Sequence, residues 1–128
     1  MIFIVDDDEG VRDSLRLLLE CEGFEAREFG SCREFLDAGG TGGGDCLILD
    51  VHMTGMSGLD LLEGMRRRGD RVPVILITGR PDAATRNRAQ AAEALAVIEK
   101  PYKVGEMLAL VRHALDRGSG PASLRLRG

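Results

Sequence analysis

The chain has 128 residues, 44% hydrophobic and 30% charged, a balance typical of one globular domain rather than a disordered chain. Its formal net charge of -4 argues against a protein that binds nucleic acid regardless of sequence, because such proteins are basic. Apolar runs are too short for a membrane span or a signal peptide. Cys21, Cys32 and Cys46 lack metal-site spacing, so we expect reduced, mostly packing cysteines in a cytoplasmic protein.

Short apolar runs alternate with amphipathic stretches along the chain. In chain order, we expect strands at 2–5, 24–29, 46–49, 72–77 and 96–98, each followed by a helix, at 9–22, 31–36, 58–68, 82–94 and 104–117. Ser31 and Asp82 are the expected N-caps of their helices, and Gly23 closes the first helix. This α/β alternation predicts a parallel sheet with helices on both faces.

One domain is expected at 1–117, and 118–128 is expected to be a linker or a flexible C-terminal tail. The helical periodicity also predicts which side chains face the core of this domain. They are Val11, Leu15, Leu18, Leu19, Leu61, Leu62, Met65, Met107, Leu108, Val111 and Leu115.

Charged and hydroxyl side chains follow four of the five apolar runs. Asp6-Asp7-Asp8 ends the first, Asp50 the third, Thr78 the fourth and Lys100 the fifth. The functional crevice of an open parallel sheet lies at the carboxyl ends of its strands, so these side chains are expected to converge. Like charges ~4 Å apart repel by roughly 4 kcal/mol at an effective dielectric of 20, which favours a bound cation such as Mg²⁺. A carboxylate beside Mg²⁺ and a lysine can act as a nucleophile toward a phosphoryl group.

The motifs at these strand ends resemble those of bacterial response-regulator receiver domains. They are Val5-Asp6-Asp7-Asp8-Glu9, Leu47 to Met53, Met56-Ser57-Gly58, Val74 to Gly79 and Ile98-Glu99-Lys100-Pro101. The Thr-Gly pair and the Glu-Lys-Pro run resemble the nitrogen-fixation-regulator branch of that family. The resemblance covers about residues 1–117 and implies a flavodoxin-like, doubly wound five-stranded sheet of order 2-1-3-4-5, flanked by five helices.

The resemblance also implies a role for each site residue. Asp50 would accept a phosphoryl group from a sensor histidine kinase, Thr78 would contact that group, and Lys100 would bridge to Asp50. Asp7 and Asp50 would ligate Mg²⁺ directly, Asp6 through water and His52 through its main-chain carbonyl. The peptide bond between Lys100 and Pro101 is expected to be cis.

Three positions depart from the family pattern. Thr54 replaces a usual proline, so either the loop after Asp50 is less rigid or the change is simply tolerated. Glu93 replaces a usual glycine, which predicts a differently shaped turn after the fourth helix. Val97 stands where many members carry a Tyr or Phe that reports phosphorylation, so we expect the signal to leave through residues 79–84 with Val97 nearly still. The alternative is that residue 97 is ordinary core and that another side chain, such as Leu95, takes the part of the aromatic ring.

His52 and Arg80 each lie two positions after a site residue. In similar receivers these positions affect how fast the phosphoryl group is lost, and two basic side chains there would shield it from water. The alternative is that both side chains simply point to solvent.

Three other functions compete with that of a receiver. Asp50-Val51-His52-Met53-Thr54 faintly resembles the haloacid-dehalogenase phosphatase motif, but its second acid is replaced by His52. A flavin-binding module would need phosphate donors after the first strand, where this chain has acids. A degenerate receiver that acts only as an interaction module is a further alternative, although all the expected site residues are present.

The function expected is therefore a phosphorylation-activated switch of a two-component system, not a turnover enzyme on external substrates. Its partners would be a sensor histidine kinase and either a C-terminal DNA-binding output domain or a separate protein. A homodimer on phosphorylation is plausible, through the fourth and fifth helices, while membrane or direct nucleic-acid binding by this domain is not expected.

Overall fold

The structure, a computed structural model, describes residues 1–118. The elements are β1 (Ile2–Val5), α1 (Glu9–Cys21), β2 (Ala26–Phe29), α2 (Cys32–Asp37), β3 (Cys46–Asp50), α3 (Gly58–Arg67), β4 (Val74–Thr78), α4 (Ala83–Ala91), β5 (Ala96–Glu99) and α5 (Val104–Gly118). Each expected element is present. The first strand has the expected ends, and the others are shifted at one or both ends; α4, for example, ends at Ala91 rather than near Ala94. The expected linker or tail lies, from residue 119 onward, outside the described residues.

The five strands form one parallel sheet in the order β2-β1-β3-β4-β5, which confirms the predicted topology. Val5 pairs with Leu49, so Asp6 and Asp50, each one residue further on, leave the sheet at the same edge. Asp50 pairs with Ile77, and Thr78 pairs with Glu99 immediately before Lys100. The register therefore brings the four strand ends together.

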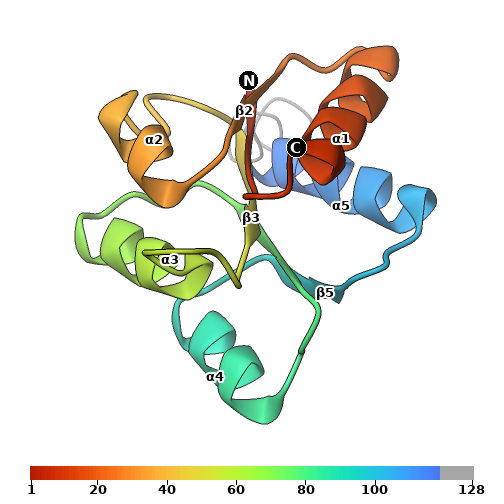
Figure 1. Ribbon diagram of the computed structural model, residues 1–128. Coiled ribbons are helices and arrows are strands. Elements are labelled where there is room, and N and C mark those ends of the chain that lie inside the picture. The colour runs from red at the N-terminus through yellow and green to blue at the C-terminus, as the bar shows by residue number, and fades with distance from the viewer. Residues whose placement is uncertain (119–128) are drawn as a thin grey trace, which may run out of the picture.

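Helices cover both faces of the sheet, with α2, α3 and α4 on one side and α1 and α5 on the other (Figure 1). Side chains alternate between the faces, so Phe3 and Val5 pack under the first group of helices while Ile2 and Ile4 pack under the second. Most of the side chains expected to face the core are buried. Val11, Leu18 and Leu115 are the exceptions and are half-buried.

Side-chain caps begin the four helices that follow the first four strands. Asp8, Ser31, Ser57 and Asp82 each accept a hydrogen bond from the main-chain N–H three residues later. Gly23 ends α1 with φ +89°, as its position predicts.

Glu93 follows α4 with φ +58°, the left-handed conformation that glycine favours. The expectation of a differently shaped turn is therefore not met, because the glutamate keeps a glycine-like backbone. Arg66 Nη2 donates to the Glu93 carbonyl at 3.1 Å, and Arg71 pairs with the Glu93 carboxylate at 2.7 Å. These contacts help to offset the cost of a left-handed non-glycine residue.

The cysteines divide into two buried residues and one exposed residue. Burial raises the pKa of the Cys32 thiol to about 11 and that of Cys46 to about 12, so both are inert packing residues. Cys21 is exposed at the end of α1, where the expectation of a packing role does not hold. Among the described residues, no helix is both long enough and apolar enough to cross a membrane.

Candidate functional site

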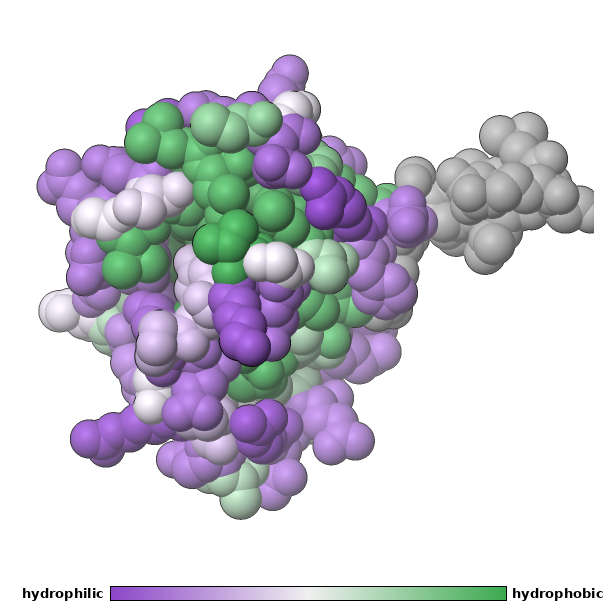
Figure 2. Space-filling model, turned by 90° about the vertical axis from the view of Figure 1, so that its right-hand side faces the viewer, coloured by the Kyte–Doolittle hydropathy of each residue, from purple (hydrophilic) through white to green (hydrophobic). Residues whose placement is uncertain are grey.

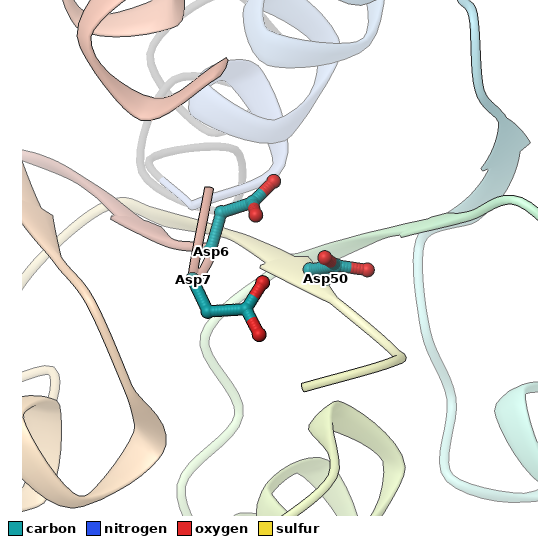
Figure 3. Close-up of side chains that lie close together, drawn as sticks. All are labelled: Asp6, Asp7 and Asp50. Atoms are coloured by element: carbon teal, nitrogen blue, oxygen red, sulfur yellow. The ribbon is translucent and has the colours of Figure 1, made fainter. Parts of the chain in front are cut away.

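Three carboxylates meet at the carboxyl edge of the sheet (Figure 3). Asp6 and Asp7 follow β1 and Asp50 ends β3, and one oxygen from each lies within 4.8 Å of the others. Asp6 is 2% exposed and Asp50 4%, whereas Asp7 is open to solvent. The sequence-based prediction that these acids converge is correct.

Lys100 lies between the two buried carboxylates. Its Nζ donates to Asp50 Oδ2 at 3.1 Å and to Asp6 Oδ2 at 3.3 Å. Burial lowers the pKa of Lys100, but the hydrogen bond and charge of Asp50, with the charge of Asp6, outweigh it and the net pKa is raised. Lys100 therefore stays an ammonium and partly neutralises the cluster. The peptide bond from Lys100 to Pro101 is cis, as predicted.

The surroundings of Asp50 disfavour its charged form, whereas those of Lys100 favour its charged form. Burial raises its pKa and the nearby Asp6 charge adds to that effect, while the bonds from Lys100 and from the His52 N–H partly oppose it. The His52 N–H donates to Asp50 Oδ1 at 3.2 Å. Both oxygens of Asp50 thus have a donor, but the protein alone does not fully compensate the carboxylate charge. Such a group gains from an added cation.

Two basic side chains border the cleft above the acids. Its volume is about 590 Å³, and it is lined by Asp7, Asp8, Asp50, His52, Gly79, Arg80 and Lys100. Thr78 is fully buried at the end of β4. Its Oγ1 accepts a hydrogen bond from the Arg80 N–H at 2.9 Å, and Thr78 adjoins the lining residue Gly79 without being part of the cleft lining itself. His52 and Arg80 border the cleft while remaining exposed.

The position that departs from the proline pattern contacts the site through its main chain. The Thr54 N–H donates to Asp7 Oδ2 at 3.4 Å, a long bond that a proline at this position has no hydrogen to make. Thr54 therefore links the loop after β3 to the loop after β1.

Asp8, the third acid after β1, has a structural contact as well as a place at the cleft. Its carboxylate caps α1 by accepting from the Val11 N–H at 3.1 Å. Its own N–H donates to Asp6 Oδ1 at 2.9 Å, which orients the Asp6 side chain. Asp8 thus connects the start of α1 to the acid cluster.

The donor set fits a hard divalent cation. Three carboxylates with oxygens within 4.8 Å of one another can share one ion, and the ligands are oxygens as Mg²⁺ prefers. The predicted fourth contact, the His52 main-chain carbonyl, belongs to the loop that borders the cleft.

A parallel sheet of this strand order, with acids after β1 and β3, a hydroxyl at β4 and a lysine after β5, defines a flavodoxin-like domain of the receiver class. The family model of the response regulator receiver domain matches residues 2–112, and the chain belongs to this family.

Relatives agree with the branch inferred from the motifs. The chain is 37% identical to the transcriptional regulatory protein FixJ of Azorhizobium caulinodans over 118 residues, covering 92% of this chain and 56% of that protein. A structure of the response regulator StyR matches with a TM-score of 0.85 and 33% identity, covering 98% of this chain and 64% of that one. The crystal structure of FixJ-N matches with a TM-score of 0.78 and 32% identity, covering 90% and 92%. The chain thus spans little more than half the length of the FixJ it matches.

Proposed function

We propose that this domain is a phosphorylation-activated switch in which Asp50 accepts a phosphoryl group from a sensor histidine kinase. The observation that carries the proposal is the arrangement of Asp50, which is 4% exposed, faces Lys100 at 3.1 Å and shares an acid cluster with Asp6 and Asp7. An Asp50 oxygen attacks phosphorus, a P–O bond forms, and the bond to the leaving group breaks.

The chain's own residues have distinct parts in this proposal. Lys100 donates to the Asp50 carboxylate and places positive charge beside the transferring oxygens. The Thr78 hydroxyl donates to a phosphoryl oxygen once the group is attached. Mg²⁺, held by Asp7 and Asp50, by Asp6 through water and by the His52 carbonyl, would neutralise phosphoryl charge. His52 and Arg80 border the cleft and would limit the access of water.

The kinase would dock beside α1, where a hollow adjoins the site. This hollow has a volume of about 760 Å³ and is lined by Asp8, Gly10, Val11, Ser14, Lys100, Pro101 and Tyr102. Figure 2 shows the side of the molecule that carries α1 and α5, where hydrophobic side chains gather in a patch bordered by hydrophilic ones.

We propose a cytoplasmic protein that acts through a DNA-binding output domain or a separate partner and dimerises on phosphorylation.

Acetyl phosphate labelling tests this function directly. With Mg²⁺ the wild-type domain should become labelled, and Asp50→Asn, which keeps the size of the side chain, should abolish labelling. Labelling of Asp50→Asn at the wild-type rate would remove Asp50 from its role. A folded wild-type domain that neither binds Mg²⁺ nor becomes labelled would instead be a degenerate receiver.

The metal assignment needs its own test. Asp7→Ala should weaken Mg²⁺ binding sharply because it removes a proposed direct ligand, whereas Asp45→Ala removes an acid outside the three-carboxylate cluster and serves as the control. Undiminished binding by Asp7→Ala in a calorimetric titration would refute the ligand assignment.

A further inference from the structure

Arg12 on α1 contacts the main chain of Asp6, one of the three acids of the cluster. Its Nη1 donates to the Asp6 carbonyl at 2.9 Å, and its Nε donates to Glu28 Oε1 on β2 at 3.1 Å. The side chain is only 16% exposed. One guanidinium therefore joins α1, the end of β1 and β2.

The Asp6 carbonyl lies where the pairing of β1 with β2 comes to an end. The Asp6 N–H still donates to the Phe29 carbonyl at 3.2 Å, but the Asp6 carbonyl accepts from the Arg12 side chain and not from the main chain of β2. A Cβ built at Gly30 would lie 3.3 Å from Arg12 Nη1, so the guanidinium packs against this turn. Arg12 thus supplies a donor at the carbonyl where the strand ladder stops.

This contact fixes the peptide that joins Asp6 to Asp7. Asp6 is held at its N–H by Phe29 and at its carbonyl by Arg12, so the direction in which the chain continues to Asp7 is set. We propose that Arg12 is a positioning residue that orients the Asp6–Asp7 peptide so that both carboxylates face Asp50. The inference rests on the proposed function, because it concerns metal binding at this acid cluster.

Arg16 provides a matched control within the same network. Arg16 also pairs with Glu28, and its Nη1 pairs with Glu20 at 3.1 Å. Within the described residues Arg16 donates to carboxylates alone, whereas Arg12 also donates to the Asp6 carbonyl. Arg12→Met and Arg16→Met thus each remove one arginine from Glu28, and only the first removes the contact with Asp6.

Mg²⁺ titrations followed by amide NMR would test the proposal. Arg12→Met should bind Mg²⁺ about tenfold more weakly than the wild type, as expected when an outer partner of a ligand is lost. Arg16→Met should keep the wild-type affinity. Without metal, the chemical shift of the Asp7 amide nitrogen should change in Arg12→Met only. The reason is that the Asp6 carbonyl, which belongs to the same peptide group, loses its hydrogen-bond donor. A purely structural role would lower the free energy of unfolding without this signature.

The outcomes separate this inference from the proposed function. No Mg²⁺ binding by the wild type would contradict the function, and wild-type affinity in Arg12→Met would overturn the inference alone. If Arg12→Met does not fold, Arg12→Lys decides, since it keeps the charge and stem but lacks the planar fork that reaches both partners. Wild-type Mg²⁺ affinity and an unshifted Asp7 amide in Arg12→Lys would then overturn it.

Discussion

Single residues fix the acid cluster by main-chain contacts as well as by their own charge. Gly58 shows this at the start of α3, where its N–H donates to the Val51 carbonyl at 3.0 Å. A Cβ at this position would overlap the main-chain carbonyl of Asp50. The backbone of α3 thus approaches the end of β3 so closely that only glycine fits.

We therefore expect Gly58→Ala to lower the free energy of unfolding by about 1–3 kcal/mol, since overpacking has that typical cost. It should also weaken Mg²⁺ binding, because Asp50 must move. Gly64→Ala in the same helix is the control: its Cβ would lie 3.4 Å from the Arg68 side chain, an ordinary contact. That change should raise stability by about 0.5–1 kcal/mol. Urea unfolding of both variants checks the pair, and equal effects would contradict this account.

At the scale of elements, α4 is a helix with few buried side chains. Thr85 and Ala89 are its buried residues, so little apolar surface holds it to the sheet. Arg88 links it to α3 by pairing with Asp60 at 3.2 Å and with Glu63 at 2.7 Å, on an exposed surface where such pairs add little. The exposed surface of α4 thus includes an intramolecular contact with α3.

The turn after α4 depends on one arginine from α3. Arg66 donates to the carbonyls of Ala92, Asp70, Val72 and Glu93, at 2.9 to 3.1 Å. Arg66→Met should lower the free energy of unfolding by about 2–4 kcal/mol, because several half-buried carbonyls lose a charged donor. Arg67→Met, at the exposed neighbouring position, should have an effect of less than about 0.5 kcal/mol. Comparable losses in the two variants would argue against this role of Arg66.

The weak anchoring of α4 also supports the expected signal route. Val97 is half-buried and packs against the core under α2, α3 and α4, whereas Leu95 packs against the opposite core. Leu95 is therefore badly placed to substitute for the missing aromatic ring.

With a beryllofluoride phosphoryl mimic, we expect amide shifts across residues 79–84 and small shifts of the Val97 methyl groups. NMR spectra with and without the mimic measure both, and Asp50→Asn, which removes the proposed acceptor, should abolish the shifts. Large Val97 shifts with a quiet 79–84 segment would contradict this route.

For the whole molecule, the acid cluster opposes stability when no metal is bound. Burial and the Asp6 charge raise the pKa of Asp50, so the folded state disfavours its ionised form. A raised carboxyl pKa means that stability is gained as pH falls through the folded-state value and is lost as pH rises through it. The domain thus gives up stability at neutral pH to keep a charged site.

Asp50→Asn should therefore be more stable than the wild type at neutral pH in EDTA, and the difference should shrink as the pH is lowered. Mg²⁺ should reverse the order, because an ion at 100 times its dissociation constant stabilises the wild type by about 2.7 kcal/mol. Thermal unfolding across pH, with and without Mg²⁺, measures both effects. A less stable Asp50→Asn in EDTA would show that Lys100 fully compensates the buried charge.

The sequence by itself determined the order of elements, the parallel sheet and the acids, hydroxyl and lysine at its edge. These follow from local patterns, because apolar periodicity specifies strands and helices. The carboxyl ends of all strands in a parallel sheet also lie at the same edge of that sheet. Asp6, Asp50, Thr78 and Lys100 were thus predictable from their places after apolar runs.

Tertiary structure decided the contacts that depend on how elements pack. The donation from Arg12 to the Asp6 carbonyl, the Thr54 N–H that reaches Asp7, and the left-handed Glu93 held by Arg66 have no periodic signal in the sequence. Each joins separate segments through a main-chain carbonyl or N–H, which all residue types carry except for the N–H of proline, so residue identity alone does not indicate the partner. Only the relative placement of helix, strand and loop brings those groups within hydrogen-bond distance.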